Sequence, residues 1–194
     1  MFTGIIQHVG VIKKTERRQG SLFLTVTAPR GWKFKPGDSI AADGVCLTVQ
    51  KVSKGFYTTE LMPETLKKTT FGKSFPATVN LERPLKFGAR LDGHLVQGHV
   101  DGVGKIEAVK KNGLSHVVAI SFPQRFKKLI VSKGSIAVDG VSLTVVRVKK
   151  NVFSVALVSY TIKHTTLGKK KAGDLVNLEF DILRKYAKRT NWKI

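Results

Sequence analysis

Residues 40–49 read Ile-Ala-Ala-Asp-Gly-Val-Cys-Leu-Thr-Val, and residues 136–145 read Ile-Ala-Val-Asp-Gly-Val-Ser-Leu-Thr-Val. Eight of the ten positions are identical, at an offset of 96 residues. Self-similarity of this kind indicates a chain built from copies of one module. The 194 residues therefore divide into two copies of roughly 90 residues each, a reasonable size for a small domain.

The repeat extends well beyond these ten positions. Further matching pairs are residues 64–72 with 160–168, residues 79–82 with 176–179, Gly4 with Gly98, and Gly10 with Gly104. Two copies are too few for a solenoid, which needs at least three repeats. We predict a first domain over residues 1–92, a second over 93–181 with a linker at 93–97, and a C-terminal helix over 182–194.

Each copy contains short stretches with the alternation and the β-branched residues of strands. In the first copy these are residues 21–27, 45–52, 55–61 and 78–82. Many short strands separated by Gly-rich turns favour a small closed or nearly closed barrel. A short helix is expected to begin near Pro63 and to end before Gly72. The predicted fold class is all-β, with two homologous barrels in tandem.

The segment after the second copy has the pattern of a one-sided helix. Ile182, Leu183, Tyr186 and Ala187 fall on one helical face, and cations accumulate toward the C-terminal end, which suits the helix dipole. Two interpretations stay open. The apolar face packs against other subunits, or the helix folds back over its own barrel.

The strongest feature of the composition is charge. The chain has 34 Lys plus Arg and 13 Asp plus Glu, which gives a formal net charge of +21. Nucleic-acid binding is one interpretation of such a charge. The cations are spread along the whole chain, with no Arg-Gly repeats and no interleaved aromatic residues that could stack on bases. We therefore expect a lysine-rich solvated surface and no nucleic-acid partner.

Neither the apolar segments nor the cysteine content indicates a membrane protein or a secreted one. No apolar run approaches the roughly 18 residues that span a bilayer, and residues 1–11 lack the basic segment and cleavage site of a signal peptide. Cys46 is the single cysteine, which excludes an intrachain disulfide and a Cys-rich metal cluster. We expect a cytoplasmic protein without a membrane partner.

The segment 93–102 between the copies is dense in Gly and carries His94 and His99. A metal site is not expected, because the further ligands that would complete one are missing. A histidine here acts as a general acid or base, or bonds to the backbone as a structural residue. Cys46 and its repeat partner Ser142 are buried small residues or polar contacts in two similar pockets. Two such pockets suit two similar ligand molecules.

In their order and spacing, these motifs resemble the riboflavin synthase family of the alpha-chain type. The resemblance rests on residues 1–6, the duplicated Asp-Gly-Val-(Cys/Ser)-Leu-Thr-Val segments, residues 93–101 and residues 165–168. It implies two six-stranded Greek-key barrels and a homotrimer held by the C-terminal helix, with each active site between two subunits. It also implies a dismutation of two 6,7-dimethyl-8-ribityllumazine molecules by four-carbon transfer. The products are riboflavin and 5-amino-6-ribitylaminouracil, and no metal or redox cofactor takes part.

Carried over by position, the resemblance also implies the residues of the site. The catalytic or polarising set is Phe2, Ser39, Cys46, His99, Thr144 and Asp181. The pocket of the first barrel would use Gly4, Ile5, Ile6, Cys46, Leu47, Thr48, Glu60, Leu61, Met62, Pro63, Glu64, Thr65, Gly98, His99 and Val100. The pocket of the second barrel would use Lys133, Ser142, Leu143, Thr144, Leu157, Val158, Ser159, Tyr160, Thr161 and Ile162. Backbone groups there can bind the pyrimidinedione edge, and Thr and Glu side chains can bind ribityl hydroxyls.

The second copy departs from the family pattern at residues 158–161, which read Val-Ser-Tyr-Thr where family members usually have a Pro followed by Glu or His. This departure puts the geometry of the second pocket in question. Two other functions stay open. A lumazine-carrying antenna protein of the same fold binds its chromophore as a monomer without turnover. A basic nucleic-acid-binding barrel would bind DNA or RNA in a salt-dependent manner.

Overall fold

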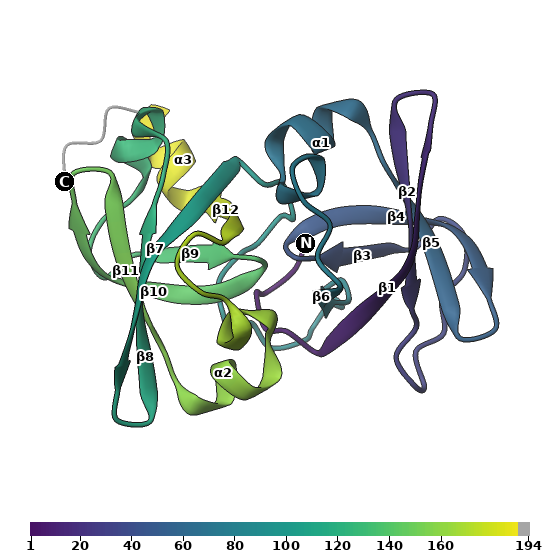
Figure 1. Ribbon diagram of the computed structural model, residues 1–194, viewed down its shortest axis with the longest axis horizontal. Coiled ribbons are helices and arrows are strands. Elements are labelled where there is room, and N and C mark those ends of the chain that lie inside the picture. The colour runs from purple at the N-terminus through teal and green to yellow at the C-terminus, as the bar shows by residue number, and fades with distance from the viewer. Residues whose placement is uncertain (190–194) are drawn as a thin grey trace.

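The computed structural model describes residues 1–189 and contains two closed barrels that lie side by side (Figure 1). The first barrel has the strand order β1-β2-β5-β4-β3-β6. Its strands are β1 (His8–Arg18), β2 (Ser21–Thr27), β3 (Ser39–Ala42), β4 (Val45–Ser53), β5 (Phe56–Leu61) and β6 (Thr78–Glu82). Every pair of neighbouring strands is antiparallel.

The second barrel repeats this topology strand for strand. Its strands are β7 (Gly102–Asn112), β8 (Ser115–Ser121), β9 (Ser135–Val138), β10 (Val141–Lys149), β11 (Val152–Leu157) and β12 (Leu175–Phe180). The two stretches with eight identical residues form the β3–β4 and β9–β10 hairpins. The all-β prediction of two six-stranded barrels in tandem is therefore confirmed.

Each barrel closes around its own apolar core. In β5 the burial alternates residue by residue, so that Tyr57 and Leu61 point inward beside Leu24 of β2. The second barrel buries the equivalent face, with Phe153 and Leu157 of β11 inside. Closure leaves neither barrel with an unpaired edge strand, which is how a small antiparallel sheet avoids pairing with other chains.

Short helices cover the ends of the barrels and follow the last strand. They are α1 (Pro63–Lys68), η1 (Thr70–Gly72), η2 (Gln124–Leu129), α2 (Ser159–His164), η3 (Thr166–Lys169) and α3 (Ile182–Arg189). The predicted helix after Met62 is confirmed, with Pro63 in its first turn. The second copy forms the equivalent helix without a Pro.

The C-terminal helix α3 packs partly on its own barrel. Lys185 forms an ion pair of 2.7 Å with Asp101, and the helix contacts η2. Leu183 and Tyr186 stay exposed, at 65% and 59%. The expected apolar face is thus divided between these two exposed side chains and the half-buried Ile182 and Ala187. The last five residues of the predicted helix, 190–194, lie outside the described residues.

Two asparagines join the barrels across a local pseudo-twofold axis. Asn80 of β6 donates from Nδ2 to the backbone oxygen of Asp139 at 2.9 Å, and Asn177 of β12 donates to that of Asp43 at 2.9 Å. Within each barrel, the aspartate side chain accepts the backbone N–H of the asparagine. Asp43 Oδ1 accepts the Asn80 N–H and Asp139 Oδ1 accepts the Asn177 N–H, both at 2.7 Å. All four residues are buried, so these bonds fix the relative position of the barrels.

Candidate functional site

Each barrel lends a short backbone segment to the outer surface of the other. We call residues 2–6 the first strap and residues 96–100 the second strap. The backbone oxygen of Gly4 accepts the Ser142 N–H of β10 at 2.8 Å, and that of Gly98 accepts the Cys46 N–H of β4 at 2.8 Å. The two straps are therefore exchanged between the repeats.

Only glycine fits where the straps cross the strands. Gly4 and Gly98 have φ angles of +78° and +80°, in the left-handed region that glycine tolerates best. A Cβ on Gly4 would lie 2.6 Å from the Ser142 Cβ, and one on Gly98 would lie 2.6 Å from the Cys46 Cβ. The straps therefore lie directly against Cys46 and Ser142, which are equivalent positions with different side chains in the two repeats.

Two buried carboxylates hold the straps in place. Glu82 accepts the N–H groups of Thr3 and Gly4 at 2.7 and 3.0 Å. Glu179 accepts those of Gln97 and Gly98 at 2.7 and 2.9 Å. Burial raises the pKa of both carboxyl groups, and these N–H donors oppose that effect. The Glu of each Val-Asn-Leu-Glu repeat is thus an anchor for the neighbouring strap.

A cavity of about 210 Å³ lies where the second strap meets α1 and β4. It is lined by Val45, Cys46, Glu64, Thr65, Lys68, Thr69, Gly98, His99 and Val100. The structure thus brings together six residues expected for the first pocket, although they come from three distant segments of the sequence. Its walls offer a thiol, hydroxyls, a carboxylate, an ammonium and an imidazole, which are groups that bind a polar ring and a polyol chain.

The outer face of β3 and β4 continues this cavity. In the β3–β4 pair Ser39 lies opposite Thr48, and Cys46 follows on the same face because side chains alternate along a strand. Burial raises the pKa of the Cys46 thiol, and a side-chain hydrogen bond with Ser39 opposes this. Cys46 is therefore a neutral thiol at neutral pH and serves as a polar contact rather than as a thiolate nucleophile.

On the second barrel, the equivalent position holds a hydrogen-bonded pair of side chains. His94 Nδ1 lies 2.7 Å from Ser142 Oγ. Burial lowers the pKa of His94, while the negative charge of Asp181 acts in the opposite direction. A neutral imidazole on a serine hydroxyl can accept a proton through that hydroxyl. The set expected from the sequence contained His99 but not His94, although both lie in the same Gly-rich segment.

Three expected residues of the first pocket belong to the other barrel, which corrects our assignment of Gly4, Ile5 and Ile6. Gly4 lies on Ser142, and Ile6 packs against the core of the second barrel. Ile5 between them is 43% exposed. The reason is the exchange of the straps, since the first strap covers β10 and the second covers β4. The position of Gly98, His99 and Val100 on the first barrel is as expected.

Several other expected residues face the barrel interior. Leu47, Leu61, Leu143 and Leu157 are core side chains, so only their backbone groups reach the outer face. Phe2 is fully buried between the barrels, where its N–H donates to the Val96 oxygen at 2.7 Å. Phe2 thus supports the two straps from beneath. The positions of the four leucines follow from strand alternation, which places every second residue of β4, β5, β10 and β11 inside.

The remaining expected residues lie at the strand ends and the helix starts. Glu60 is half-buried at the end of β5, and the exposed Met62 and Pro63 lead into α1. On the second barrel, Thr144 is exposed on β10, and Lys133 has a φ angle of +64° in the loop before β9. The exposed Val158, Ser159 and Tyr160 and the half-buried Thr161 and Ile162 surround the start of α2.

The helices beside the two pockets carry different side chains at matching positions. In α1, Glu64 and Lys68 form an ion pair of 2.9 Å. The equivalent residues of α2, Tyr160 and His164, stack their rings with centroids 4.0 Å apart. The departure in the second copy therefore replaces an ion pair with an aromatic pair, and Tyr160 stays 66% exposed.

The fold and the site define a class of protein that holds ring-shaped ligands on paired barrels. Its features here are two closed barrels, exchanged straps and two related polar surfaces. The model of the lumazine binding domain matches this chain twice, over residues 3–84 and 97–181. The protein LumP, solved with 6,7-dimethyl-8-(1'-D-ribityl) lumazine, has a TM-score of 0.84 and 25% identity, and the match covers 92% of this chain and 98% of that one.

The chain belongs to the riboflavin synthase family. Riboflavin synthase of Mycobacterium bovis is 43% identical over 195 residues, which cover 97% of each chain. That of Actinobacillus pleuropneumoniae is 42% identical over 188 residues, covering 96% of this chain and 87% of the relative. That of Bacillus subtilis is 36% identical over 191 residues, covering 97% and 89%.

Two kinds of feature are absent from residues 1–189. None of the helices described there is long and apolar enough to cross a membrane. In the same residues, no group of three or more His, Cys, Asp or Glu side chains is arranged to hold a metal ion.

Proposed function

We propose that this chain is a transferase that converts two molecules of 6,7-dimethyl-8-ribityllumazine into riboflavin and 5-amino-6-ribitylaminouracil. One lumazine donates a four-carbon unit to the other. The observation that carries the proposal is the pair of related polar surfaces on β4 and β10, each crossed by a strap, in a chain that belongs to the riboflavin synthase family. A reaction between two identical molecules needs two related binding surfaces, and the repeat supplies them.

The two pockets support different steps because their polar groups differ. The reaction needs a proton removed from the 7-methyl group of one lumazine and a nucleophile added at C7 of the other. In our proposal the His94–Ser142 pair, with Asp181 nearby, moves a proton at the second pocket. Ser39, Cys46 and His99 polarise the ring at the first pocket, and the exposed Thr48 and Thr144 bind polar atoms of the ligand. Much of the rate would come from holding the two rings face to face.

We further propose a homotrimer in which the first barrel of one subunit faces the second barrel of the next. The support is the C-terminal helix, on which Leu183 and Tyr186 are exposed although the helix is tied to its own barrel. Exposed apolar side chains on a short helix suit packing against equivalent helices of other subunits. Light scattering after size exclusion tests this, and a monomer would contradict it.

The proposed units of the chain are the barrels 1–92 and 93–181, with the linker at 93–97, and the helix 182–194. Each barrel carries a strap that lies on the other barrel. We therefore expect neither barrel to keep a complete pocket when it is expressed alone. We also propose a cytoplasmic location, which suits a chain with a single cysteine.

An antenna-type protein is the second candidate function. It is supported by LumP, which was also solved with riboflavin and has a TM-score of 0.86 and 25% identity. Such a protein would bind lumazine as a monomer without converting it.

One experiment separates the two functions. The purified protein is incubated with 6,7-dimethyl-8-ribityllumazine in metal-free buffer, and riboflavin is followed by its absorbance. Steady formation of riboflavin supports the transferase. Tight binding of lumazine without riboflavin would overturn it in favour of the antenna function, and salt-dependent binding of DNA without lumazine binding would contradict both.

A further inference from the structure

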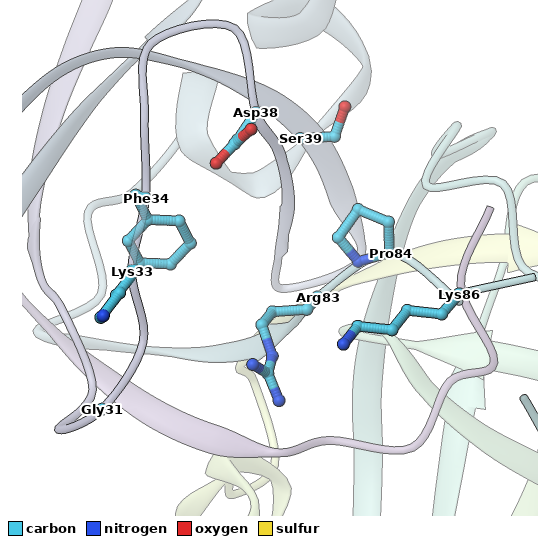
Figure 2. Close-up of a pocket in the computed structure, with 8 residues that line it drawn as sticks. All are labelled: Gly31, Lys33, Phe34, Asp38, Ser39, Arg83, Pro84 and Lys86. Atoms are coloured by element: carbon cyan, nitrogen blue, oxygen red, sulfur yellow. The ribbon is translucent and has the colours of Figure 1, made fainter.

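A second, larger cavity of about 410 Å³ opens on the first barrel, on the far side of Ser39 from the strap. Figure 2 shows the eight residues that line it, which are Gly31, Lys33, Phe34, Asp38, Ser39, Arg83, Pro84 and Lys86. One wall is the loop between β2 and β3, and the other is the segment that follows β6. The lining has three cations and one acid, so the cavity is cationic.

Arg83 is held in place by uncharged partners. Its Nε donates to Gln7 Oε1 at 3.2 Å, and its guanidinium carbon lies 4.5 Å from the centroid of the Trp32 ring. Among residues 1–189, neither Arg83 nor Lys86 lies within ion-pair distance of a carboxylate. Both side chains line the cavity of Figure 2.

The acid in the lining is committed to its own loop. Asp38 Oδ2 accepts the Lys35 N–H at 2.9 Å, and Figure 2 shows this carboxylate apart from the Arg83 side chain. The cavity therefore has a cationic end formed by Arg83 and Lys86, and the other oxygen of Asp38 is its hydroxyl-binding group. The ring of Phe34 belongs to the loop wall of the cavity.

The second barrel has a counterpart of this cavity with different chemistry. That cavity measures about 220 Å³, and its lining includes Leu129, Val131, Ser135 and Leu183 together with one charge of each sign, Asp181 and Arg184. Ser135 is the repeat partner of Ser39, Leu129 of Lys33, and Leu183 of Lys86. Two lysines of the first copy are thus replaced by leucines, and α3 covers the site. The cationic character therefore belongs to the first copy and is not a consequence of the fold.

A second opening extends the cationic end. A cavity of about 340 Å³ shares Arg83, Pro84 and Lys86 with the first and lies against Glu82 and Arg90. Its acids are engaged, since Glu82 holds the first strap and Asp92 pairs with Arg90 at 3.2 Å. Arg83 and Lys86 thus line both cavities, and neither side chain is paired with a carboxylate of residues 1–189.

We propose that the cavity of Figure 2 binds a phosphate monoester of a small polyol, such as a pentose phosphate. Arg83 and Lys86 bind the phosphate, because a guanidinium and an ammonium together match its charge and its oxygen geometry. Asp38 binds hydroxyl groups at the other end. The volume lies within the range of small-molecule sites, roughly 300–1,000 Å³. None of the molecules in the proposed reaction carries a phosphate, so this site would take a different ligand.

The test is isothermal titration of the full chain with ribose 5-phosphate in a phosphate-free, low-salt buffer. Lys86→Gln removes one phosphate contact without disturbing a side-chain hydrogen bond, and Lys54→Gln removes an equal charge from an exposed turn of the same barrel. We expect binding by the parent and by Lys54→Gln, and a Kd about tenfold higher in Lys86→Gln, the loss of roughly one charged contact. Inorganic phosphate should compete, and ribose should not bind.

Equal Kd values in the two variants would overturn the proposal, because binding would then reflect the overall charge of +21 rather than this cavity. Binding of ribose with the same affinity would overturn the assignment of the phosphate to Arg83 and Lys86. Arg83→Lys gives an independent measurement, because it keeps the positive charge but loses the planar geometry of the guanidinium. If the Kd is unchanged both in Arg83→Lys and in Lys86→Gln, the proposed site is contradicted.

Discussion

The imidazole Nδ1 of His94 lies 2.7 Å from the hydroxyl oxygen of Ser142, so a residue from the linker reaches the middle of the β9–β10 hairpin. Cys46 occupies the equivalent position in the first barrel, and its side-chain partner is Ser39 of its own barrel. The duplicated pockets are therefore not equivalent in proton chemistry. Only the second has a titratable base bonded to its central side chain within residues 1–189.

His94→Gln should lower kcat more than it weakens lumazine binding. Glutamine keeps a hydrogen-bonding group near Ser142 but cannot accept the proton, and general-base catalysis contributes about 10²–10⁴-fold. Single-turnover kinetics and lumazine titration separate the two quantities. His99→Ala should also lower turnover more than binding. If both variants turn over at the parent rate, neither histidine takes part in the proton transfers.

The acid limb of the activity should lie at a lower pH than the ordinary histidine pKa of 6.5. Burial lowers the pKa of His94 in the folded chain, so the neutral base persists to a lower pH than in the unfolded chain. Protonation then favours the unfolded state, and stability also falls from about pH 6.5 downward. The kcat–pH profile of the parent should lose its acid limb in His94→Gln. An identical acid limb in both would contradict this.

Gly44→Ala should destabilise the chain more than Gly55→Ala. Both glycines have nearly the same positive φ, +76° and +78°, so the backbone strain of the two substitutions is matched. A Cβ on Gly44 would lie 2.6 Å from the Gly140 nitrogen of the other barrel, whereas nothing lies within 4 Å of one on Gly55. We expect about 1–3 kcal/mol of additional loss from overpacking, measured by urea unfolding. Equal losses would show that the barrels can separate freely at this point.

Asn80→Ala should weaken the junction between the barrels. It removes the bond to the Asp139 oxygen and leaves the Thr166 N–H, which Asn80 Oδ1 accepts at 2.8 Å, without that partner. Unsatisfied buried groups cost about 1–3 kcal/mol each. Thermal unfolding should show a clear drop in Tm relative to the exposed control Asn112→Ala. A drop no larger than that of the control would mean that the junction depends on apolar packing alone.

Tyr160→Phe should weaken lumazine binding at the second pocket severalfold while keeping the stack on His164. The substitution removes the hydroxyl that stands where the first pocket has the Glu64 carboxylate. Losing one neutral hydrogen bond costs about 0.5–1.5 kcal/mol. Fluorescence titration should then resolve one unchanged and one weaker site. Two unchanged sites would show that the Tyr160 hydroxyl does not contact the ligand.

Most strands of the repeat can be predicted from the sequence because one face of each is buried, which gives an alternating apolar pattern. Residues 21–27 form β2 with the predicted bounds, and Thr78–Glu82 form β6. The long strands β1 and β7 were not predicted, since their outer halves are exposed and rich in Lys and Glu. Exposed strand halves carry no apolar alternation, so only their pairing with β2 and β8 defines them.

The location of the straps could not be read from the sequence. Gly4 and Gly98 are repeat partners, and each matches the start of its own copy. Nothing in that match says that each lies on the other barrel. The exchange depends on the backbone bonds from Ser142 to Gly4 and from Cys46 to Gly98, and such long-range bonds leave no local pattern. The same holds for His94, whose partner Ser142 is 48 residues further along the chain.

By itself the sequence determined the duplication, the all-β class and the family, because these follow from local residue patterns that recur at a constant offset. Tertiary structure alone decided which barrel each strap covers, which histidine contacts Ser142, and where Arg83 and Lys86 meet in one cavity. The first two relations depend on the junction of Asn80 and Asn177 with the facing hairpins, which sets the two barrels in a single orientation, and the third depends on the packing of the β2–β3 loop against the segment after β6. Side chains from distant segments meet only after that orientation is formed.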